Sequence, residues 1–540
     1  MATIKVPKKE IEKYAPINAE LLEKMNLMGI PIEAIHENEI EFEVMPNRPD
    51  ALSIQGYLRA LKAYIGKEPG LKKYKILPPE KNYKVNVDSS VKDIRPYTVC
   101  AIVKNISLDL ERIKEIIDLQ EKMHNTLGRN RKKLAIGIYP LDKIKLPIKY
   151  TSLHPDKIKF TPLESQKEMT GRQILQRHPT GKEYAHLLEG LERYPVFMDS
   201  KSNILSMPPI INSHETGKVT ENTKELFIEC SGFDLPFLKR ALNIIVTTFA
   251  EMNGEVYQME ISNPKRTITP DLTPEIIPLS LKRANDLLGL KLKESDISKL
   301  LSKIGYNYKS GKVEIPAWRL DILHEVDIIE DIAIAYGYDK LIPEIPNINT
   351  IGSESAESKI KSKISEILIG LGLLETSSYH LIKQDEAKII GLDNPIELKD
   401  SRTEYKILRP NLLIPALRIL AENKDNEYPQ RIFELGTVFA PDKNTETKIK
   451  ESSSLLVALT PSNFTEAKQI LNSLTKSLGL SYSLEETTKK EFIEGRTALI
   501  KINNKIAGYL GELNPKTILE WNIKMPVSVI EISLERIFAL

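Results

Sequence analysis

Apolar residues follow a helical period in some stretches of the chain and a strand period in others. Residues 18–29 repeat them at helical spacing and end on a glycine, which predicts a helix with a left-handed C-terminal cap. Residues 40–44 alternate apolar and acidic side chains, as in a strand with one buried face. After a turn-rich loop, the helical pattern returns over residues 51–64, with Asp50 as the predicted N-cap. Residues 1–88 therefore predict a small α/β module.

A second module, residues 89–265, mixes the two periods. Apolar runs at 99–103 and 134–139 predict strands, and residues 110–127 predict a helix between them. The sequence Asp-Ser-Lys-Ser-Asn at 199–203 lies between two short apolar runs and predicts a hairpin connection, because these residue types favour turns. We expect a mixed α/β domain here.

Two helical patterns follow, one ended by Gly289 and the other by Gly305. They predict a helical domain of winged or paired-helix type over residues 266–346. A stretch rich in Pro, Asn, Ser and Thr begins at its end and marks the boundary with residues 347–540, where helix and strand patterns mix again. The chain as a whole predicts an α+β multidomain protein.

Composition narrows the class of protein. The 540 residues exceed what one hydrophobic core usually serves, which agrees with about three to five domains. No apolar run approaches the roughly 18 residues of a membrane span, and the N-terminus lacks the apolar segment of a secretory signal. Cys100 and Cys230 are the only cysteines, which excludes a disulfide framework, so we expect a reducing, cytoplasmic location. Because the net charge is only +2, any contact with RNA must come from local patches.

The sharpest chemical pattern is a group of four carboxylates: Asp321, Asp327, Glu330 and Asp331. The last three stand at i, i+3 and i+4, so they share one helical face, and the first can bend back over the first turn. No lysine or arginine lies between the first and last of them, so the acids should repel one another unless a cation joins them. Magnesium prefers such oxygen ligands. A solvated acidic face at a helix N-terminus explains the spacing at least as well.

The context of these acids resembles the β subunits of phenylalanyl-tRNA synthetases. Pro-Ala-Trp-Arg-Leu-Asp-Ile precedes most of them and Ala-Tyr-Gly-Tyr-Asp follows. Other segments resemble members of that family in the same order along the chain: Met-Pro-Asn-Arg-Pro-Asp at 45–50, Asn-Ile-Leu-Ser-Met-Pro-Pro at 203–209, Leu-Arg-Pro-Asn-Leu at 408–412, Arg-Ile-Phe-Glu-Leu-Gly at 431–436 and Gly-Tyr-Leu-Gly-Glu-Leu-Asn-Pro at 508–515. Each match alone is weak, but their shared order is specific.

The resemblance implies roles for particular residues. It assigns a structural Mg²⁺ site to Asp321, Asp327, Glu330 and Asp331. It assigns an editing pocket of the archaeal and eukaryotic type to Phe197, Ser206, Glu229 and Ser231. Such a pocket is needed because a site built for phenylalanine rejects tyrosine only about a hundredfold. The family pattern has Asp and Thr where this chain has Glu229 and Ser231, so we expect a changed pocket shape.

The same resemblance implies a complex. The chain would be the β subunit of a phenylalanine–tRNA ligase, with the ATP site in an α subunit, an (αβ)₂ assembly and tRNA-Phe as the substrate. Residues 347–540 would form a class II synthetase-like antiparallel sheet with helices. We expect it to be inactive, because after Arg431 no later glycine-rich strand and helix supplies the second arginine of such centres. Its amphipathic helix at 360–371 would pack against the α subunit.

Two other functions fit parts of the sequence. A freestanding deacylase of mischarged tRNA would not need residues 347–540. A magnesium-dependent nuclease would use the four acids, which instead lie in a helix with apolar faces. The basic run at 129–133 is interpreted as a turn at a helix end rather than a contact to tRNA phosphates. His178, His186 and His214 accompany no nucleophile motif and are interpreted as structural.

Overall fold

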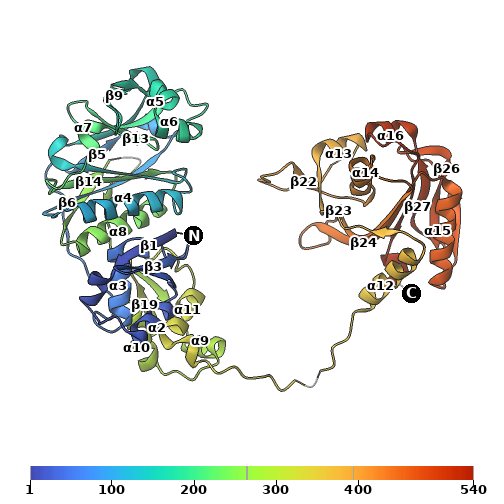
Figure 1. Cartoon of the computed structure of the whole chain (residues 1–540), viewed down its shortest axis with the longest axis horizontal. Helices are drawn as coiled ribbons and strands as arrows, with labels where there is room; N and C mark the ends of the chain where they lie inside the picture. The colour runs from blue at the N-terminus through green and yellow to red at the C-terminus, as the bar shows by residue number, and fades with distance from the viewer. Residues whose placement is uncertain (1, 263–264, 349, 393, 539–540) are drawn as a thin grey trace. The chain divides into compact units, whose positions relative to one another are not determined.

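The computed structural model describes residues 2–262, 265–348, 350–392 and 394–538. The chain forms two compact units, Met1–Ile345 (unit 1) and Pro346–Leu540 (unit 2) (Figure 1). None of the helices in the described ranges is both long and apolar enough to span a membrane.

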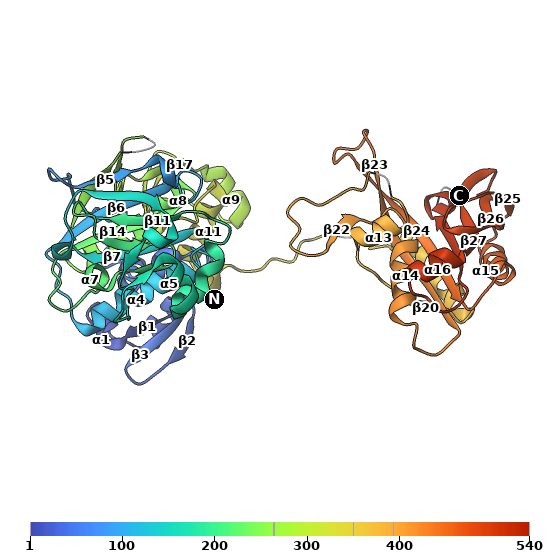
Figure 2. The same ribbon diagram turned by 90° about the horizontal axis from the view of Figure 1, so that it is seen from above.

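Unit 1 begins with a small antiparallel sheet. Its order is β1 (Ala2–Pro7), β3 (Glu39–Val44) and β2 (Ile32–Ile35) (Figure 2). The alternating apolar residues of β3 are buried, as the pattern predicted. Helix α2 (Ala19–Leu27) precedes β2, and Gly29 follows the helix with a positive φ of 78°, which a glycine adopts without strain.

The predicted N-cap of the next helix is wrong. Helix α3 (Ile54–Tyr64) begins after Ser53, whose hydroxyl accepts a hydrogen bond of 3.0 Å from the backbone N–H of Gly56. Asp50 lies in a separate 3₁₀ turn and is buried. The Arg48 guanidinium donates to both of its carboxylate oxygens, at 2.9 and 3.0 Å, so this carboxylate is not free to cap the helix.

A mixed sheet of 11 strands forms the centre of unit 1. Its main order, with bounds, is β13 (Ile211–Asn212), β12 (Ile204–Met207), β11 (Tyr194–Met198), β8 (Ile148–Leu153), β5 (Lys84–Val87), β15 (Glu255–Ile261), β6 (Tyr97–Lys104), β14 (Leu226–Gly232) and β7 (Leu134–Pro140). Strands β4 (Ile76–Leu77) and β16 (Thr267–Thr269) also pair with β15. The predicted hairpin connection at 199–203 is confirmed, because it joins β11 to β12.

Two helices cover one face of this sheet. Helix α8 (Leu235–Glu251) packs on β6, β14 and β15, and α4 (Leu110–Asn125) packs on β7 (Figure 1). Because β14 lies between β6 and β7 with a helix over it, all seven of its residues are buried. A charged side chain on β14 is therefore unusual and calls for an explanation.

The last part of unit 1 joins three helices to a small antiparallel sheet. The sheet order is β17 (Glu275–Pro278), β19 (Lys312–Ile315) and β18 (Asn307–Lys309). The helices are α9 (Leu281–Leu288), α10 (Glu294–Lys303) and α11 (Glu325–Tyr336). Gly289 and Gly305 follow the first two with φ of 68° and 84°, so the predicted helix ends are confirmed.

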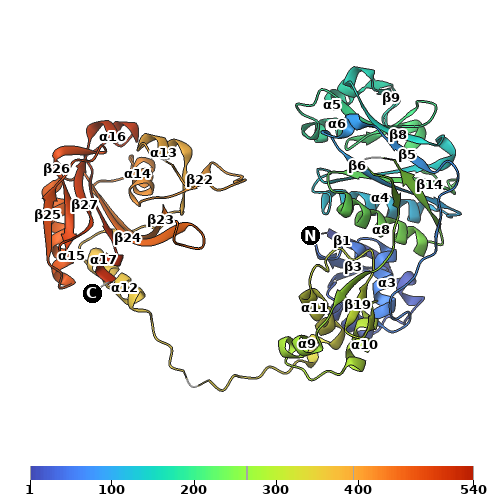
Figure 3. The ribbon, with the colours of Figure 1, turned by 180° about the vertical axis from the view of Figure 1, so that it is seen from behind.

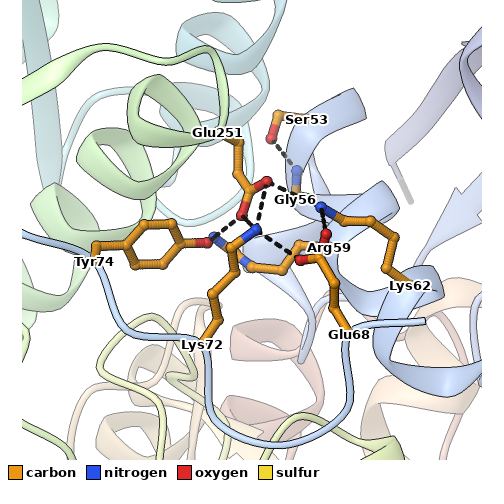
Figure 4. Close-up of polar contacts among 8 residues, drawn as sticks. All are labelled: Ser53, Gly56, Arg59, Lys62, Glu68, Lys72, Tyr74 and Glu251. Carbon is orange, nitrogen blue, oxygen red and sulfur yellow. Dashed lines mark hydrogen bonds and ion pairs between the residues drawn. The ribbon is translucent and has the colours of Figure 1, made fainter. Parts of the chain in front are cut away.

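A buried network of charges links distant segments of unit 1. Glu251, the last residue of α8, accepts hydrogen bonds from Tyr74, from Lys72 and, at 3.3 Å, from Lys62 of α3 (Figure 4). Glu68 binds the same two lysines, at 2.8 and 3.1 Å. The carboxylate of Glu251 and the ammonium of Lys62 are almost completely buried, and each compensates the charge of the other. The network holds α8 against α3.

Unit 2 is a seven-stranded sheet with helices on both faces. Its order is β20 (Leu374–Glu375), β23 (Gln430–Pro441), β24 (Ile449–Thr460), β28 (Ser528–Ser533), β27 (Lys505–Leu513), β26 (Phe492–Ile502) and β25 (Tyr482–Glu486). Figure 3 shows α15 (Phe464–Ser477) and α14 (Leu413–Glu422) beside this sheet. Alternate residues of β24 enter two different cores, one shared with α15 and the other with α14. The two cores explain why β24 is a continuous apolar run near its end.

Helix α12 (Ala356–Gly370) is amphipathic as predicted, but its apolar face has a different partner. Ile364 and Leu368 are fully buried in the core shared with α15, and Ile360 and Ile367 pack against the same core. The prediction that this face packs against another subunit is therefore wrong. The sequence shows that a helix has an apolar face but does not show which surface covers it.

Candidate functional site

A cavity of about 640 Å³ lies at the β7 edge of the large sheet in unit 1. Its walls are α4, β7, the segment 208–219 and the start of α6 (Pro179–Tyr184). The volume is within the usual range of small-molecule sites. The polar side chains that line it are Gln120, Glu121, His124, Arg131, Glu164, His178, Thr180, Asn212, His214, Lys218 and Glu229.

Glu229 reaches the cavity from β14, the strand next to the edge strand β7. It is paired with Gly137 of β7, the strand that forms this edge of the sheet. A Cβ atom at position 137 would lie 2.6 Å from Glu229 Oε1 and 2.2 Å from the hydroxyl of Tyr139. The glycine therefore leaves the space in which the glutamate and the tyrosine meet.

The Glu229 carboxyl is buried and weakly paired. It is 2% exposed, its Oε1 lies 3.3 Å from the Tyr139 hydroxyl, and its Oε2 has no hydrogen-bond partner. Burial raises the pKa of this carboxyl to about 8, although the Arg95 charge and the Tyr139 hydroxyl act in the opposite direction. At neutral pH the group is mainly the uncharged acid, with one hydrogen-bond donor and an acceptor.

The Tyr139 hydroxyl connects two of the predicted pocket residues. It lies 2.8 Å from Ser206 Oγ and 3.3 Å from Glu229 Oε1. A hydroxyl has one proton, so it donates to only one of these acceptors at a time. When it donates to Ser206, the protonated Glu229 can donate to the tyrosine oxygen. The structure thus brings Ser206 and Glu229 into one hydrogen-bond chain.

Of the four predicted pocket residues, Glu229 lines the cavity, whereas Phe197, Ser206 and Ser231 do not. Phe197 pairs with Ser206 across β11 and β12, is fully buried, and stacks on Tyr150 with ring centroids 4.3 Å apart. Ser231 is also fully buried, and its hydroxyl accepts a hydrogen bond of 3.1 Å from Arg95 Nε.

Two histidines that we interpreted as structural do line the cavity. His178 Nε2 lies 3.2 Å from the Leu163 carbonyl, which can only accept, so the neutral ring carries its proton on Nε2. The lone pair is then on Nδ1, which is buried and has no partner. His214 Nδ1 is also buried and unpartnered. No sequence motif marks these two histidines, because they reach the cavity from the starts of two separate short helices.

The basic run 129–133 forms the turn between α4 and β7, as predicted. Arg129, Asn130 and Arg131 all have positive φ, of 50°, 53° and 63°, a conformation that these residue types rarely adopt in succession. The turn directs Arg131 into the cavity wall, where it donates to the Ile210 carbonyl at 2.8 Å and to Glu121 at 3.0 Å. Burial acts against ionisation of Glu121, but its contacts with the His124 and Arg131 side chains lower its pKa to about 2.

The four carboxylates around α11 are not equivalent. Asp321 and Asp331 both bind the buried guanidinium of Arg319, at 2.7 and 2.9 Å. Asp327 accepts hydrogen bonds of 2.8 Å from two backbone N–H groups at the start of the helix. Glu330 is exposed. Arg319 stands two residues before Asp321. The prediction from spacing considered only the residues between Asp321 and Asp331 and so left out this cation.

The acids do not converge on one point in this arrangement. Among the described residues, no three His, Cys, Asp or Glu side chains come together in a way that could hold a metal ion. A Mg²⁺ ion bound by Asp321 and Asp331 would compete with Arg319 for the same oxygens.

Three segments of the chain match families of known proteins. Residues 91–245 match the B3/4 domain, residues 277–338 the tRNA synthetase B5 domain, and residues 342–534 the phenylalanyl tRNA synthetase beta chain CLM domain. The cavity lies within the first of them, and the four acids lie within the second.

Whole-length relatives and a solved structure are also similar. The phenylalanine–tRNA ligase beta subunit of Thermococcus sibiricus is 39% identical over 518 residues, which cover 92% of this chain and 91% of the relative. That of Archaeoglobus fulgidus is 36% identical, with 98% and 97% covered. The crystal structure of an N-terminal fragment of the phenylalanyl-tRNA synthetase beta subunit from Pyrococcus horikoshii matches with a TM-score of 0.59 and 38% identity, covering 62% of this chain and 99% of the fragment.

Proposed function

The chain belongs to the family of phenylalanyl-tRNA synthetase β subunits, and from that premise we propose that the cavity beside Glu229 hydrolyses tyrosine wrongly attached to tRNA-Phe. As a β subunit, the protein is part of the ligase that joins phenylalanine to its tRNA. We propose that the aminoacylation centre, with its ATP site, belongs to the α subunit. The relatives match the chain over nearly their whole length, which favours this reading over a freestanding deacylase.

One observation carries the proposal: Glu229 lines the cavity, and its buried Oε2 has no hydrogen-bond partner. A buried polar group without a partner is costly, so such a group inside a cavity indicates a ligand that completes it. A tyrosine phenol can donate its proton to this oxygen, whereas phenylalanine offers no polar group there. Sites built to bind a substrate hydroxyl reject the analogue that lacks it by about 10⁴-fold or more.

The histidines suggest how water attacks. In the proposed reaction, a water oxygen bonds to the ester carbonyl carbon while His178 Nδ1 accepts the water proton. The bond to the terminal ribose oxygen then breaks, and that oxygen takes the proton back from the imidazolium. The products are free tyrosine and uncharged tRNA. His214 Nδ1 is a second acceptor for water or for a substrate hydrogen.

Deacylation of Tyr-tRNA-Phe by the αβ complex tests this function. The Glu229→Ala variant should hydrolyse Tyr-tRNA-Phe at least tenfold more slowly, because the phenol loses its acceptor. Glu192→Ala is the matched control, because Glu192 is an exposed carboxylate of the same unit. Equal rates for the wild type and Glu229→Ala would remove Glu229 from the role, and no hydrolysis by the wild type would remove the editing function itself.

We also propose a supporting role for unit 2. Two arginines of its sheet region are already paired, Arg409 with Glu434 and Arg431 with Glu466, both at 2.7 Å. Class II centres need free arginines to hold ATP phosphates. Unit 2 would therefore serve assembly rather than catalysis. Isolated β subunit that formed phenylalanyl-adenylate would contradict this assignment.

The remaining proposals concern assembly and the metal. We propose an (αβ)₂ complex that works on tRNA-Phe in the cytoplasm. We also propose that Asp321, Asp327, Glu330 and Asp331 bind Mg²⁺ only when Arg319 moves away from the two buried aspartates. Family resemblance supports this site, and titration of the αβ complex with Mg²⁺ tests it.

A further inference from the structure

Four isoleucines are exposed in the segment that joins the two units. Ile342, Ile345, Ile348 and Ile351 have exposed fractions of 86%, 95%, 65% and 100%. None of the described residues between 341 and 355 belongs to a helix or a strand (Figure 3). Single exposed apolar residues are normal, but four in ten positions form a surface that water does not favour. None of the described residues of this segment belongs to the cores of units 1 and 2.

The spacing of these isoleucines is three residues throughout. A polyproline II helix has three residues per turn, so it would place all four side chains in one line. A strand has a period of two and would divide them between its faces. An α-helix would spread them around half its circumference, and Pro346 would interrupt it. Pro343 and Pro346 instead favour the extended form. The segment can therefore present a straight apolar stripe.

The charges of the segment limit the kind of partner. Residues 341–355 contain no lysine or arginine and two glutamates, Glu344 and Glu354. RNA binding depends on cations that neutralise phosphates, so this segment is not a tRNA contact. The positions between the isoleucines are proline, glutamate, asparagine and threonine, so the polar residues face away from the stripe. The surface that accepts the stripe must be apolar and protein in nature.

We propose that this stripe, Ile342, Ile345, Ile348 and Ile351, docks in extended form into an apolar groove of the α subunit. The proposal goes beyond the editing function and depends only on membership of the β-subunit family, whose name implies an α partner. In polyproline II form the stripe spans about 28 Å, with side chains about 9 Å apart. The groove should therefore carry four apolar pockets at that repeat.

The test compares variants of the full-length β subunit in complex with α. Serine at all four isoleucines should increase the dissociation rate of the αβ complex, by about tenfold for each side chain that is buried. The matched control replaces Asn347 and Thr350 by serine and should leave the rate unchanged. A single serine inserted between Asn347 and Ile348 keeps every isoleucine but breaks the repeat, and it should also accelerate dissociation.

Protection of the segment from proteases provides the second measurement. Cleavage between residues 342 and 351 should be rapid in isolated β and slow in the αβ complex. Equal dissociation rates for the quadruple variant and the wild type, or cleavage that α does not slow, would overturn the proposal. Protection in isolated β that increases with its concentration would overturn it in favour of a second β copy. Tyr-tRNA-Phe hydrolysis should be unaffected in every variant that remains bound to α.

Discussion

Replacing Glu229 by glutamine should change how stability depends on pH. Burial raises the pKa of this carboxyl from 4.5 to about 8, so the folded protein keeps a proton that the unfolded chain has released. The stability contributed by that proton is complete below a pH of about 4.5 and is lost progressively as the pH rises to about 8. One pKa unit corresponds to about 1.4 kcal/mol, so the total loss is about 5 kcal/mol. Glutamine is neutral throughout and loses none of it.

Urea unfolding between pH 5 and pH 9 measures this effect. The free energy of unfolding of Glu229→Gln minus that of the wild type should increase by about 1.4 kcal/mol per pH unit up to about pH 8 and stay level above it. Glu192→Gln is the control, because Glu192 is exposed and its replacement should give no such slope. A difference that does not vary with pH would show that Glu229 is ionised in the folded protein, and the hydrogen-bond chain through a neutral acid would be refuted.

Three further substitutions test other parts of the structure. Arg319→Met should cost about 3–5 kcal/mol in urea unfolding, because a buried aspartate loses its cation; a loss under about 1 kcal/mol would contradict the pairing. In that variant Mg²⁺ should raise the unfolding temperature. If Mg²⁺ changed the unfolding temperature of neither the variant nor the wild type, the metal site would be contradicted. Gly137→Ala should cost about 1–3 kcal/mol and slow Tyr-tRNA-Phe hydrolysis, because its Cβ would crowd a tyrosine hydroxyl at 2.2 Å, whereas Gly352→Ala, with nothing within 4 Å, should be neutral. Glu251→Gln should cost about 2 kcal/mol, because two lysines lose a charged acceptor; an unchanged urea midpoint would contradict the network.

Local patterns in the sequence predicted local features well. The helix ends at Gly289 and Gly305 and the hairpin at 199–203 depend on a few adjacent residues, and all three are confirmed. The predicted N-cap was wrong because the sequence offers two acceptors close together, Asp50 and Ser53. Arg48 already binds both carboxylate oxygens of Asp50, so Ser53 caps the helix. Sequence spacing alone does not show which acceptor is free.

The candidate site depends on contacts that no local pattern contains. Tyr139 and Gly137 reach Glu229 because β7 and β14 pair in one register, and 90 residues separate the tyrosine from the glutamate. His178 enters the same cavity from a helix elsewhere in the unit. The family resemblance identified Glu229 as a pocket residue. The groups that set its protonation and the histidine ring nitrogens without a partner depend on tertiary packing, so the sequence did not predict them.

The buried network around Glu251 has a consequence for protein engineering (Figure 4). Its acid belongs to the segment that contains the cavity, whereas Lys62 and Lys72 come from the N-terminal part of the chain, nearly 200 positions earlier. A chimera that exchanged only one of these parts with a distant relative would bury a lysine or a glutamate without its counter-charge. The part of unit 1 that contains the cavity is therefore not an independent module. A chimera that folds should exchange Glu251 together with Lys62 and Lys72.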